Sequence, residues 1–229
     1  MKVALFLLLS LICGVARSTG SLCQEKWFEE DVELLQNKRW GNTMIGVNGN
    51  RIRTLNGGTS EFPYYRYDLS FENVSIDFLY NIEGPDYPTA SKNWIPQLIK
   101  GETVECGDPY KKYCPQYLAY SFWPTPFSDR DVCQICCTTK TSSIADIQMA
   151  VRTVPFKYCD SVSNETLVHM TEHVAKFFWV NGTQIRFTYL GSEDPGGNFP
   201  AWFMKLSYPW AYSSHIKSYV KYVKRSQEV

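Results

Sequence analysis

The chain has 229 residues, with 23 lysines and arginines against 23 aspartates and glutamates, so its formal net charge at neutral pH is zero. Without a net positive field, long-range attraction to nucleic acid is not expected. Aromatic residues make up 15% of the chain, and such side chains supply large apolar areas for a core or for a ligand cavity. We find no internal repeat and no linker rich in Pro, Gly and Ser, which favours one domain.

Residues 1–16 have the features of a secretory signal peptide. Lys2 precedes a mainly apolar run that ends at Cys13, and Gly14 and Ala16 place small residues at the −3 and −1 positions of a cleavage site. The apolar run is too short to cross a bilayer comfortably. We therefore expect cleavage after Ala16, or as late as Gly20, and a secreted, extracellular domain over residues 21–229.

Three Asn-x-Ser/Thr sequons agree with export and predict glycosylated asparagines on the surface. They begin at Asn73, Asn164 and Asn181.

The cysteines also favour an oxidising compartment. Of the 8 cysteines, Cys13 lies in the leader, and the seven that remain are an odd number, which predicts a free thiol or an intermolecular bridge. Cys106 and Cys114 flank a short loop and are predicted to form a disulfide, while the other pairings stay open. Cys133 and Cys136 have C-x-x-C spacing, but strand residues three apart point to opposite faces, so these two should not bridge each other.

In the first part of the domain, the pattern predicts one helix, three strands and a second helix. Apolar residues at helical spacing indicate an amphipathic helix over residues 25–36. Antiparallel strands are expected at residues 43–47, 51–55 and 64–71, with a hairpin turn at Asn48 to Asn50. A short helix capped by Ser75 should end at Gly84.

The middle of the chain alternates strands and loops. Strands are expected at residues 103–105, 116–123, 131–140, 144–154, 168–179 and 184–190. Pro124 and Pro126 predict a loop over residues 123–131, because proline cannot donate to a central strand ladder. Asn181-Gly182 predicts the tight turn of the last hairpin.

The last fifth of the chain predicts a long helix that must be buried. Gly196 and Gly197 can adopt positive φ in a reversing turn, and Pro200 suits the first turn of a helix. Apolar residues then recur at helical spacing on both sides of Pro209, where a kink is expected.

Two motifs and this helix resemble the START (StAR-related lipid-transfer) domain family. The motifs are the loop Trp-Pro-Thr-Pro-Phe-Ser-Asp-Arg-Asp at 123–131 and Asp-Pro-Gly-Gly-Asn-Phe-Pro-Ala-Trp at 194–202, and Trp94 matches a further tryptophan of the family. The resemblance spans residues 27–223. It implies an α+β helix-grip fold: a curved antiparallel β-sheet wrapped around a long C-terminal α-helix, with an N-terminal helix, enclosing a tunnel for one lipid.

The resemblance implies a lipid-binding or transfer protein without a cofactor, and a gate formed by the 123–128 loop and the C-terminal helix. The cavity and gate residues expected on this basis are Trp123, Phe127, Arg130, Gln134, Cys136, Phe199, Trp202, Phe203 and Trp210. Alternation along the strand that begins at Arg130 places Gln134 and Cys136 on one face. Ordinary core packing is the alternative for each aromatic residue.

The sequence departs from the family at two cavity positions. Many members carry an arginine where this chain has Cys136, and choline-recognising members carry an aromatic residue where it has Ala119. These departures predict a less polar cavity and an apolar ligand: a sterol, a carotenoid, a fatty acid or, with less support, a phospholipid.

Other functional classes also compete with lipid binding. His169, Glu172 and His173 match the H-x-x-E-H zinc motif, which needs a helix; in a strand Glu172 would point away from both histidines. A cavity enzyme acting on a hydrophobic small molecule is another alternative, although no G-x-S-x-G motif, paired carboxylate site or phosphate loop is evident. A recognition protein with a filled core is a third.

Membrane contact is a further hypothesis. Lys217, Lys221 and Lys224 form one stripe of the C-terminal helix. Such a stripe can face an anionic membrane transiently, but it is more simply a solvated face.

Overall fold

The computed structural model describes residues 22–37, 39–41, 52–55, 62–106, 113–121, 127–140, 144–163, 166–198 and 200–227. The predicted signal peptide, the 43–47 strand and the Asn48 to Asn50 turn lie outside these residues. The elements are α2 (Glu25–Gln36), β1 (Ile52–Leu55), β2 (Tyr64–Glu72), α3 (Ile76–Glu83), α4 (Tyr87–Ala90), η1 (Ser91–Asn93), β3 (Leu98–Thr103), β4 (Pro115–Tyr120), β5 (Arg130–Thr139), β6 (Ile147–Thr153), η2 (Phe156–Tyr158), β7 (Val168–His169), β8 (Thr171–Asn181), β9 (Gln184–Asp194) and α5 (Ala201–Arg225).

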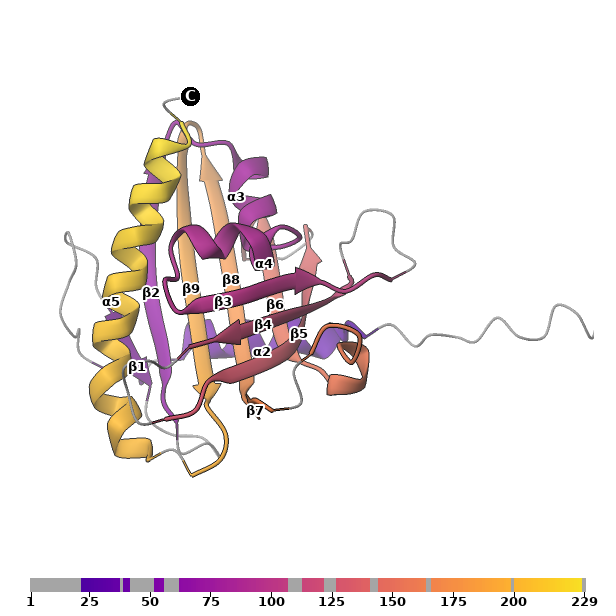
Figure 1. Ribbon diagram of the computed structural model, residues 1–229. Coiled ribbons are helices and arrows are strands. Elements are labelled where there is room, and N and C mark those ends of the chain that lie inside the picture. Colours follow the sequence, from indigo (N-terminus) through magenta and orange to yellow (C-terminus); the bar gives the residue numbers. More distant parts are fainter. Residues whose placement is uncertain are drawn as a thin grey trace, which may run out of the picture.

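The strands form one curved nine-stranded sheet in the order β1-β2-β9-β8-β6-β5-β4-β3. All neighbours in this order are antiparallel, while the short β7 pairs with β5 in parallel. Figure 1 shows α5 lying along β2, with β3, β4 and β5 crossing in front of the longer strands. The sheet, the long C-terminal helix and α2 make this the predicted helix-grip fold.

Alternation along β5 separates the two faces of the sheet. Val132 and Cys136 belong to the apolar cluster that includes α5, whereas Cys133, Ile135 and Cys137 belong to a cluster that includes Trp27 and Phe28 of α2. The inner face therefore meets α5 and the outer face meets α2.

A buried ion pair and a disulfide fasten α2 to the outer face. Asp31, which is fully buried, lies 2.6 Å from Arg152 Nη2 and 2.9 Å from His173 Nε2. The Cys23–Cys137 disulfide joins the segment before α2 to β5. These contacts fix α2 across β5, β6 and β8.

Several sequence predictions are confirmed, and others need new bounds. The helix over residues 25–36 has the predicted limits, and α5 runs through Pro209. The strand expected at 103–105 is β3 at Leu98–Thr103, and that expected at 116–123 is β4 at Pro115–Tyr120. The strand expected at 168–179 is interrupted at Met170, because β7 pairs with β5 rather than with β6.

The disulfides use six of the seven cysteines. The predicted Cys106–Cys114 bond is present, and Cys23–Cys137 and Cys133–Cys159 complete the set. Cys133 and Cys136 are not bonded to each other, as the strand geometry predicted, and Cys136 is a buried free thiol.

We predict that Asp31→Ala lowers the free energy of unfolding by about 3–5 kcal/mol, because the buried Arg152 guanidinium loses its charged partner. Denaturant unfolding of the oxidised protein measures this. Glu30→Ala, at an exposed position of the same helix, should stay within about 0.5 kcal/mol of the wild type. Equal effects of the two substitutions would contradict the role given to Asp31.

Candidate ligand-binding cavity

A cavity of about 500 Å³ lies between α5 and the inner face of the sheet. Such a volume falls within the range of roughly 300–1,000 Å³ typical of small-molecule sites. Its lining includes residues from α3, α4, the segment after η1, six strands and α5 (Tyr67, Glu83, Tyr87, Trp94, Ile95, Gln97, Tyr120, Ser121, Gln134, Val151, Met170, Glu172, Val174, Lys176, Tyr189, Glu193, Phe203, Ser207, Tyr208, Trp210, Ala211, Tyr212, His215 and Tyr219).

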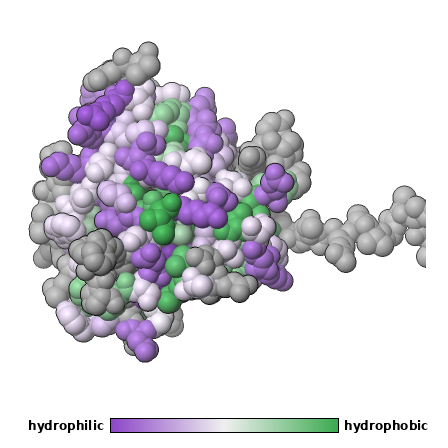
Figure 2. All heavy atoms as spheres, viewed as in Figure 1, coloured by the Kyte–Doolittle hydropathy of each residue, from purple (hydrophilic) through white to green (hydrophobic). Residues whose placement is uncertain are grey.

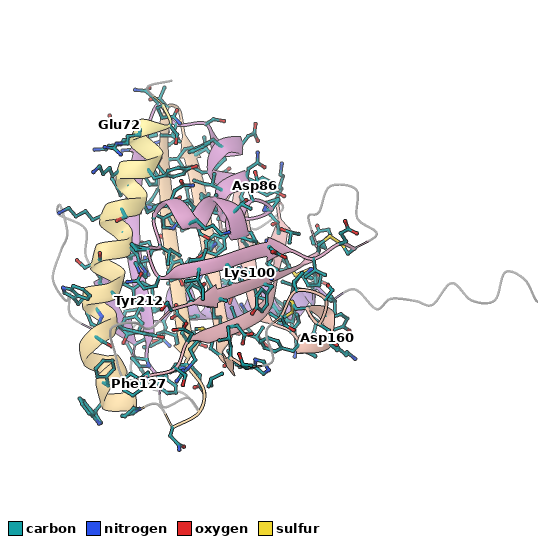
Figure 3. The ribbon with its side chains drawn as sticks, viewed as in Figure 1. Glu72, Asp86, Lys100, Phe127, Asp160 and Tyr212 are labelled. Carbon is teal, nitrogen blue, oxygen red and sulfur yellow. A yellow bond between two sulfur atoms is a disulfide. The ribbon has the colours of Figure 1, made fainter. Side chains whose placement is uncertain are left out.

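Aromatic rings form the wall between α5, β2 and β9. The rings of Tyr67 and Tyr189 stack at 4.7 Å, and Tyr212 of α5, labelled in Figure 3, lies 6.0 Å from Tyr189. Further along the helix, Tyr219 packs against Phe187 and Trp94. These large side chains occupy the space between helix and sheet and supply most of the apolar wall.

The apolar surface is mainly internal. On the face shown in Figure 2, hydrophobic residues form small separate patches among hydrophilic ones. Among the described residues, no helix is long and apolar enough to cross a membrane.

A row of polar side chains runs along the inner face of the sheet, and Gln134, Glu172 and Glu193 of this row line the cavity. Gln116 of β4 is opposite Gln134 of β5, which is opposite Thr153 of β6, and Glu172 of β8 is opposite Glu193 of β9. Thr153 and Glu172 are joined by the hydrogen bond from the Glu172 amide to Thr153 Oγ1, at 2.7 Å. Because residues directly opposite each other share one face of a sheet, all five side chains belong to the inner face. The cavity is thus more polar than the departures at Cys136 and Ala119 predicted.

Lys176 and Glu83 form an ion pair at the end of α3. Lys176 is 2% exposed, and its Nζ lies 2.8 Å from Glu83 Oε2 and 2.8 Å from the Glu83 carbonyl oxygen. The same ammonium lies 4.1 Å above the ring of Tyr87. A carboxylate, a helix C-terminus and an aromatic face therefore stabilise this buried cation together.

Glu172 and Glu193 have no such cationic partner among the described residues. The Tyr212 hydroxyl donates to Glu193 Oε1 at 2.6 Å. Burial raises the pKa of Glu193, and hydrogen bonds from Tyr212 and Tyr208 partly offset this rise. Burial, and then the neighbouring Glu193, raise the pKa of Glu172 to about 8, against a smaller lowering by Lys176. The pair of carboxyl groups therefore holds a proton at neutral pH.

Gln134, a residue of the cavity lining, has a buried acceptor without a hydrogen-bond partner among the described residues. Gln116 Nε2 donates to the Gly84 carbonyl at 2.8 Å, so Gln116 Oε1 must accept, and Gln134 Nε2 donates to it at 3.2 Å. This chain of bonds fixes the Gln134 amide orientation. Gln134 is 2% exposed, and its Oε1 has no hydrogen-bond partner among the described residues.

Three of the predicted cavity residues line the cavity: Gln134, Phe203 and Trp210. Phe127 does not line it but packs on Phe203 with ring centroids 5.2 Å apart, beside the first turn of α5 (Figure 3). Trp123 and Phe199 lie outside the described residues.

The other three predicted residues are placed differently. Trp202 is 65% exposed and points away from the cavity lining. Arg130 is buried, and its Nε donates to the Pro195 carbonyl at 2.6 Å, so it joins the start of β5 to the turn before α5. Cys136 is on the inner face but within the packed core, where burial raises the pKa of its thiol to about 11.

The H-x-x-E-H residues do not form a zinc site. His169 Nδ1 lies 2.7 Å from Asp131 Oδ1, and His173 Nε2 lies 2.9 Å from Asp31 Oδ1 on the outer face, whereas Glu172 lines the cavity. The segment is a strand, so the glutamate and the histidines point to opposite faces. Within the described ranges, no cluster of three or more His, Cys, Asp or Glu side chains could hold a metal ion.

The paired carboxyl groups of Glu172 and Glu193 were not predicted from the sequence. The turn at Gly182, which has a φ of 59°, sets the register in which Asn181 faces Gln184, and counting along both strands from there places Glu172 opposite Glu193. This signal was available once Asn181-Gly182 was taken as a two-residue turn. The Lys176–Glu83 pair joins residues 93 positions apart and has no comparable sequence signal.

No protein-family model and no curated protein sequence matches the chain. Solved structures do match. The human StAR-related lipid transfer protein 5 is 14% identical, with a TM-score of 0.71 over 88% of this chain and 94% of that one. The human STARD10 structure is 16% identical, with a TM-score of 0.68 over 90% and 84% of the two chains. The STAR-related lipid transfer protein fragment from Xanthomonas axonopodis is 18% identical, with a TM-score of 0.66 over 82% and 99%.

The chain has the helix-grip fold of START domains. The identities are low, so this likeness establishes the START fold rather than a particular ligand. The cavity of this chain occupies the space that the fold leaves between its last helix and its sheet.

We predict that Glu172→Gln stabilises the protein relative to wild type increasingly as the pH rises from about 4.5 to about 8. In this window the folded wild type holds a proton on Glu172 that the unfolded chain has released, so wild-type stability falls with rising pH. Denaturant unfolding at a series of pH values measures the difference. Glu102→Gln, at an exposed ion pair with Lys100, should show no comparable trend. A difference between Glu172→Gln and wild type that is independent of pH would contradict the raised pKa.

Proposed function

We propose that the chain is a secreted lipid-binding and transfer protein that holds one largely apolar ligand in the cavity between α5 and the sheet. The observation that carries this proposal is a cavity of about 500 Å³ walled by aromatic side chains inside the START fold. Three structures of similar fold carry the names of StAR-related lipid transfer proteins or STARD10. Each methylene group that leaves water for such a cavity contributes about 0.8 kcal/mol, so a long chain or ring system binds without a catalytic group.

Export is supported by the leader over residues 1–16 and by the sequons. Asn73 and Asn181 are both exposed, so their side chains are accessible for glycosylation, while Asn164 lies outside the described residues. The three disulfides are compatible with an oxidising compartment. N-terminal sequencing of protein from the culture medium of expressing cells should begin between residues 17 and 21.

Ligand entry is proposed between residues 123–128 and the first half of α5. Phe127 and Phe203 contact each other there, and Trp210 is 74% exposed while also lining the cavity. A tryptophan at the mouth of a cavity, with one side exposed, can insert into a membrane interface. Trp123 and Phe199 are proposed members of the same gate, and Lys217, Lys221 and Lys224, all exposed, are available for transient contact with an anionic surface.

A cavity enzyme is a second candidate because of the Glu172 and Glu193 pair. Two carboxyl groups sharing one proton can donate and accept it in turn, which general acid–base catalysis requires. The two candidates differ in the fate of the ligand. Incubation with a cell lipid extract, followed by mass spectrometry, should recover the bound molecule chemically unchanged if the protein is a carrier, and a product absent from the input would favour the enzyme.

We predict that Ala211→Trp weakens binding of a fluorescent lipid by roughly tenfold or more, because the indole fills space that the ligand needs. Ala211 lines the cavity from α5. Ser214→Trp adds the same side chain at an exposed position of the same helix and should bind the lipid as the wild type does. Fluorescence titration of delipidated protein measures both, and equal affinities of the two variants would contradict the location of the site.

A further inference from the structure

We infer that the cavity selects a lipid whose head group is a protonated amine and holds the ammonium group between Glu172 and Glu193. This inference rests on the proposed function and names the class of ligand that the site takes.

Acidic groups outnumber basic ones among the described residues of the lining. Glu83, Glu172 and Glu193 face the cavity, and Lys176 is the cationic residue among them. His215 does not add a charge, because burial lowers its pKa to about 4. Since Lys176 is paired with Glu83 at 2.8 Å, Glu172 and Glu193 are the acidic groups of the lining without a cationic partner among the described residues. A fatty-acid carboxylate or a phosphate would meet repulsion there.

The molecule already contains one ammonium bound by the same chemistry. The Lys176 ammonium has a carboxylate oxygen at 2.8 Å and the face of Tyr87 at 4.1 Å. Glu172 and Glu193 line the cavity together with Tyr189, Tyr208 and Tyr212, and the hydroxyls of Tyr208 and Tyr212 hydrogen-bond to Glu193. The second site thus also combines carboxyl groups with tyrosine side chains, and no cation from the described residues forms an ion pair with it. Tyrosine faces attract ammonium groups, and desolvation strengthens that attraction.

The hydrogen-bonding capacity of Glu172 is largely unused. Glu193 accepts hydrogen bonds from the hydroxyls of Tyr212 and Tyr208, whereas no side chain in the described ranges donates to the Glu172 carboxyl. An alkylammonium has three donors, like lysine, and could satisfy oxygens of both groups. On binding, the proton held by the pair leaves for solvent and the ligand's positive charge takes its place.

Gln134 provides a second, independent sign of a polar ligand. The residue lines the cavity, and its buried Oε1 lacks a hydrogen-bond partner among the described residues, although buried acceptors are almost always paired. Gln134 lies in the same polar row, two strands from Glu172, at a backbone separation of about 10 Å. A second donor on the head group, such as a hydroxyl, could reach it.

The test compares three probes of equal chain length: dodecylamine, dodecan-1-ol and dodecanoate. Each competes at neutral pH with a fluorescent lipid on the full secreted, delipidated protein, below its micelle-forming concentration. Dodecylamine is protonated under these conditions, as lysine is. We expect it to bind roughly tenfold or more tightly than dodecanol, because it adds charge-assisted hydrogen bonds in a desolvated site, and dodecanoate to bind least.

The double variant Glu172→Gln/Glu193→Gln should lose the preference for dodecylamine over dodecanol, measured as the ratio of the two affinities within the same variant. Glu102→Gln, in an exposed ion pair outside the lining, is the matched control and should keep it. If wild type binds dodecanol or dodecanoate as tightly as the amine, the inference fails while the proposed function stands. An unchanged amine preference in the double variant also overturns the inference. Failure of all three probes and of the fluorescent lipid contradicts the proposed function itself.

Discussion

The whole architecture depends on how α5 rests on the sheet. Its aromatic side chains contact β2 and β9 and the segment around Trp94, as in the pairs of Tyr212 with Tyr65 and of Tyr219 with Phe187. Tyrosine side chains are long and rigid. Where those of α5 do not interdigitate with side chains of the sheet, they keep the helix at a distance from the strands. Space then remains between α5 and the residues of β5, β6 and β8. The cavity is thus a consequence of where the large side chains stand on a curved sheet.

Burying the polar row costs desolvation free energy, and we propose that the same row selects the ligand. Carboxyl groups removed from bulk water favour their protonated forms. Glu172 and Glu193 face each other on adjacent strands, so repulsion between their carboxylates also favours protonation. Several other buried charges have a partner of opposite charge, as with Lys176 and Glu83 on the inner face or Asp31 and Arg152 on the outer face. Among the described residues, buried polar atoms without a hydrogen-bond partner occur on Asp31 outside and on Gln134 and Tyr219 of the cavity lining, where a ligand can bond them. Polar groups without partners, in a structure whose other polar groups are mostly paired, commonly mark a binding site.

Sequence patterns predicted the helices and strands that can be recognised from the spacing of apolar residues within one segment. The N-terminal helix follows from its apolar spacing, α5 from the turn and periodicity after Asp194, and the opposite directions of Cys133 and Cys136 from strand alternation. The family resemblance added the helix-grip fold. The interruption at Met170 was not predictable, because β7 joins β5 across a long separation.

The candidate site was predicted less well. Gln134, Phe203 and Trp210 line the cavity as expected, but Arg130 instead bonds the turn before α5, since its guanidinium reaches the Pro195 carbonyl. Cys136 and Ala119 suggested an apolar cavity, and the charged groups come from positions whose meeting depends on tertiary structure, such as Glu83 and Lys176. The pairing of Glu172 with Glu193 could have been predicted from the register of the last hairpin alone.

Native mass spectrometry of the protein purified from the medium of secreting cells tests the central claim most directly. If the space beneath α5 is a ligand site, a fraction of the protein should carry one molecule of lipid size, which is released intact on denaturation and is absent from the Ala211→Trp variant. A wild type that carries no such mass, and takes none up from a cell lipid extract, would contradict the account.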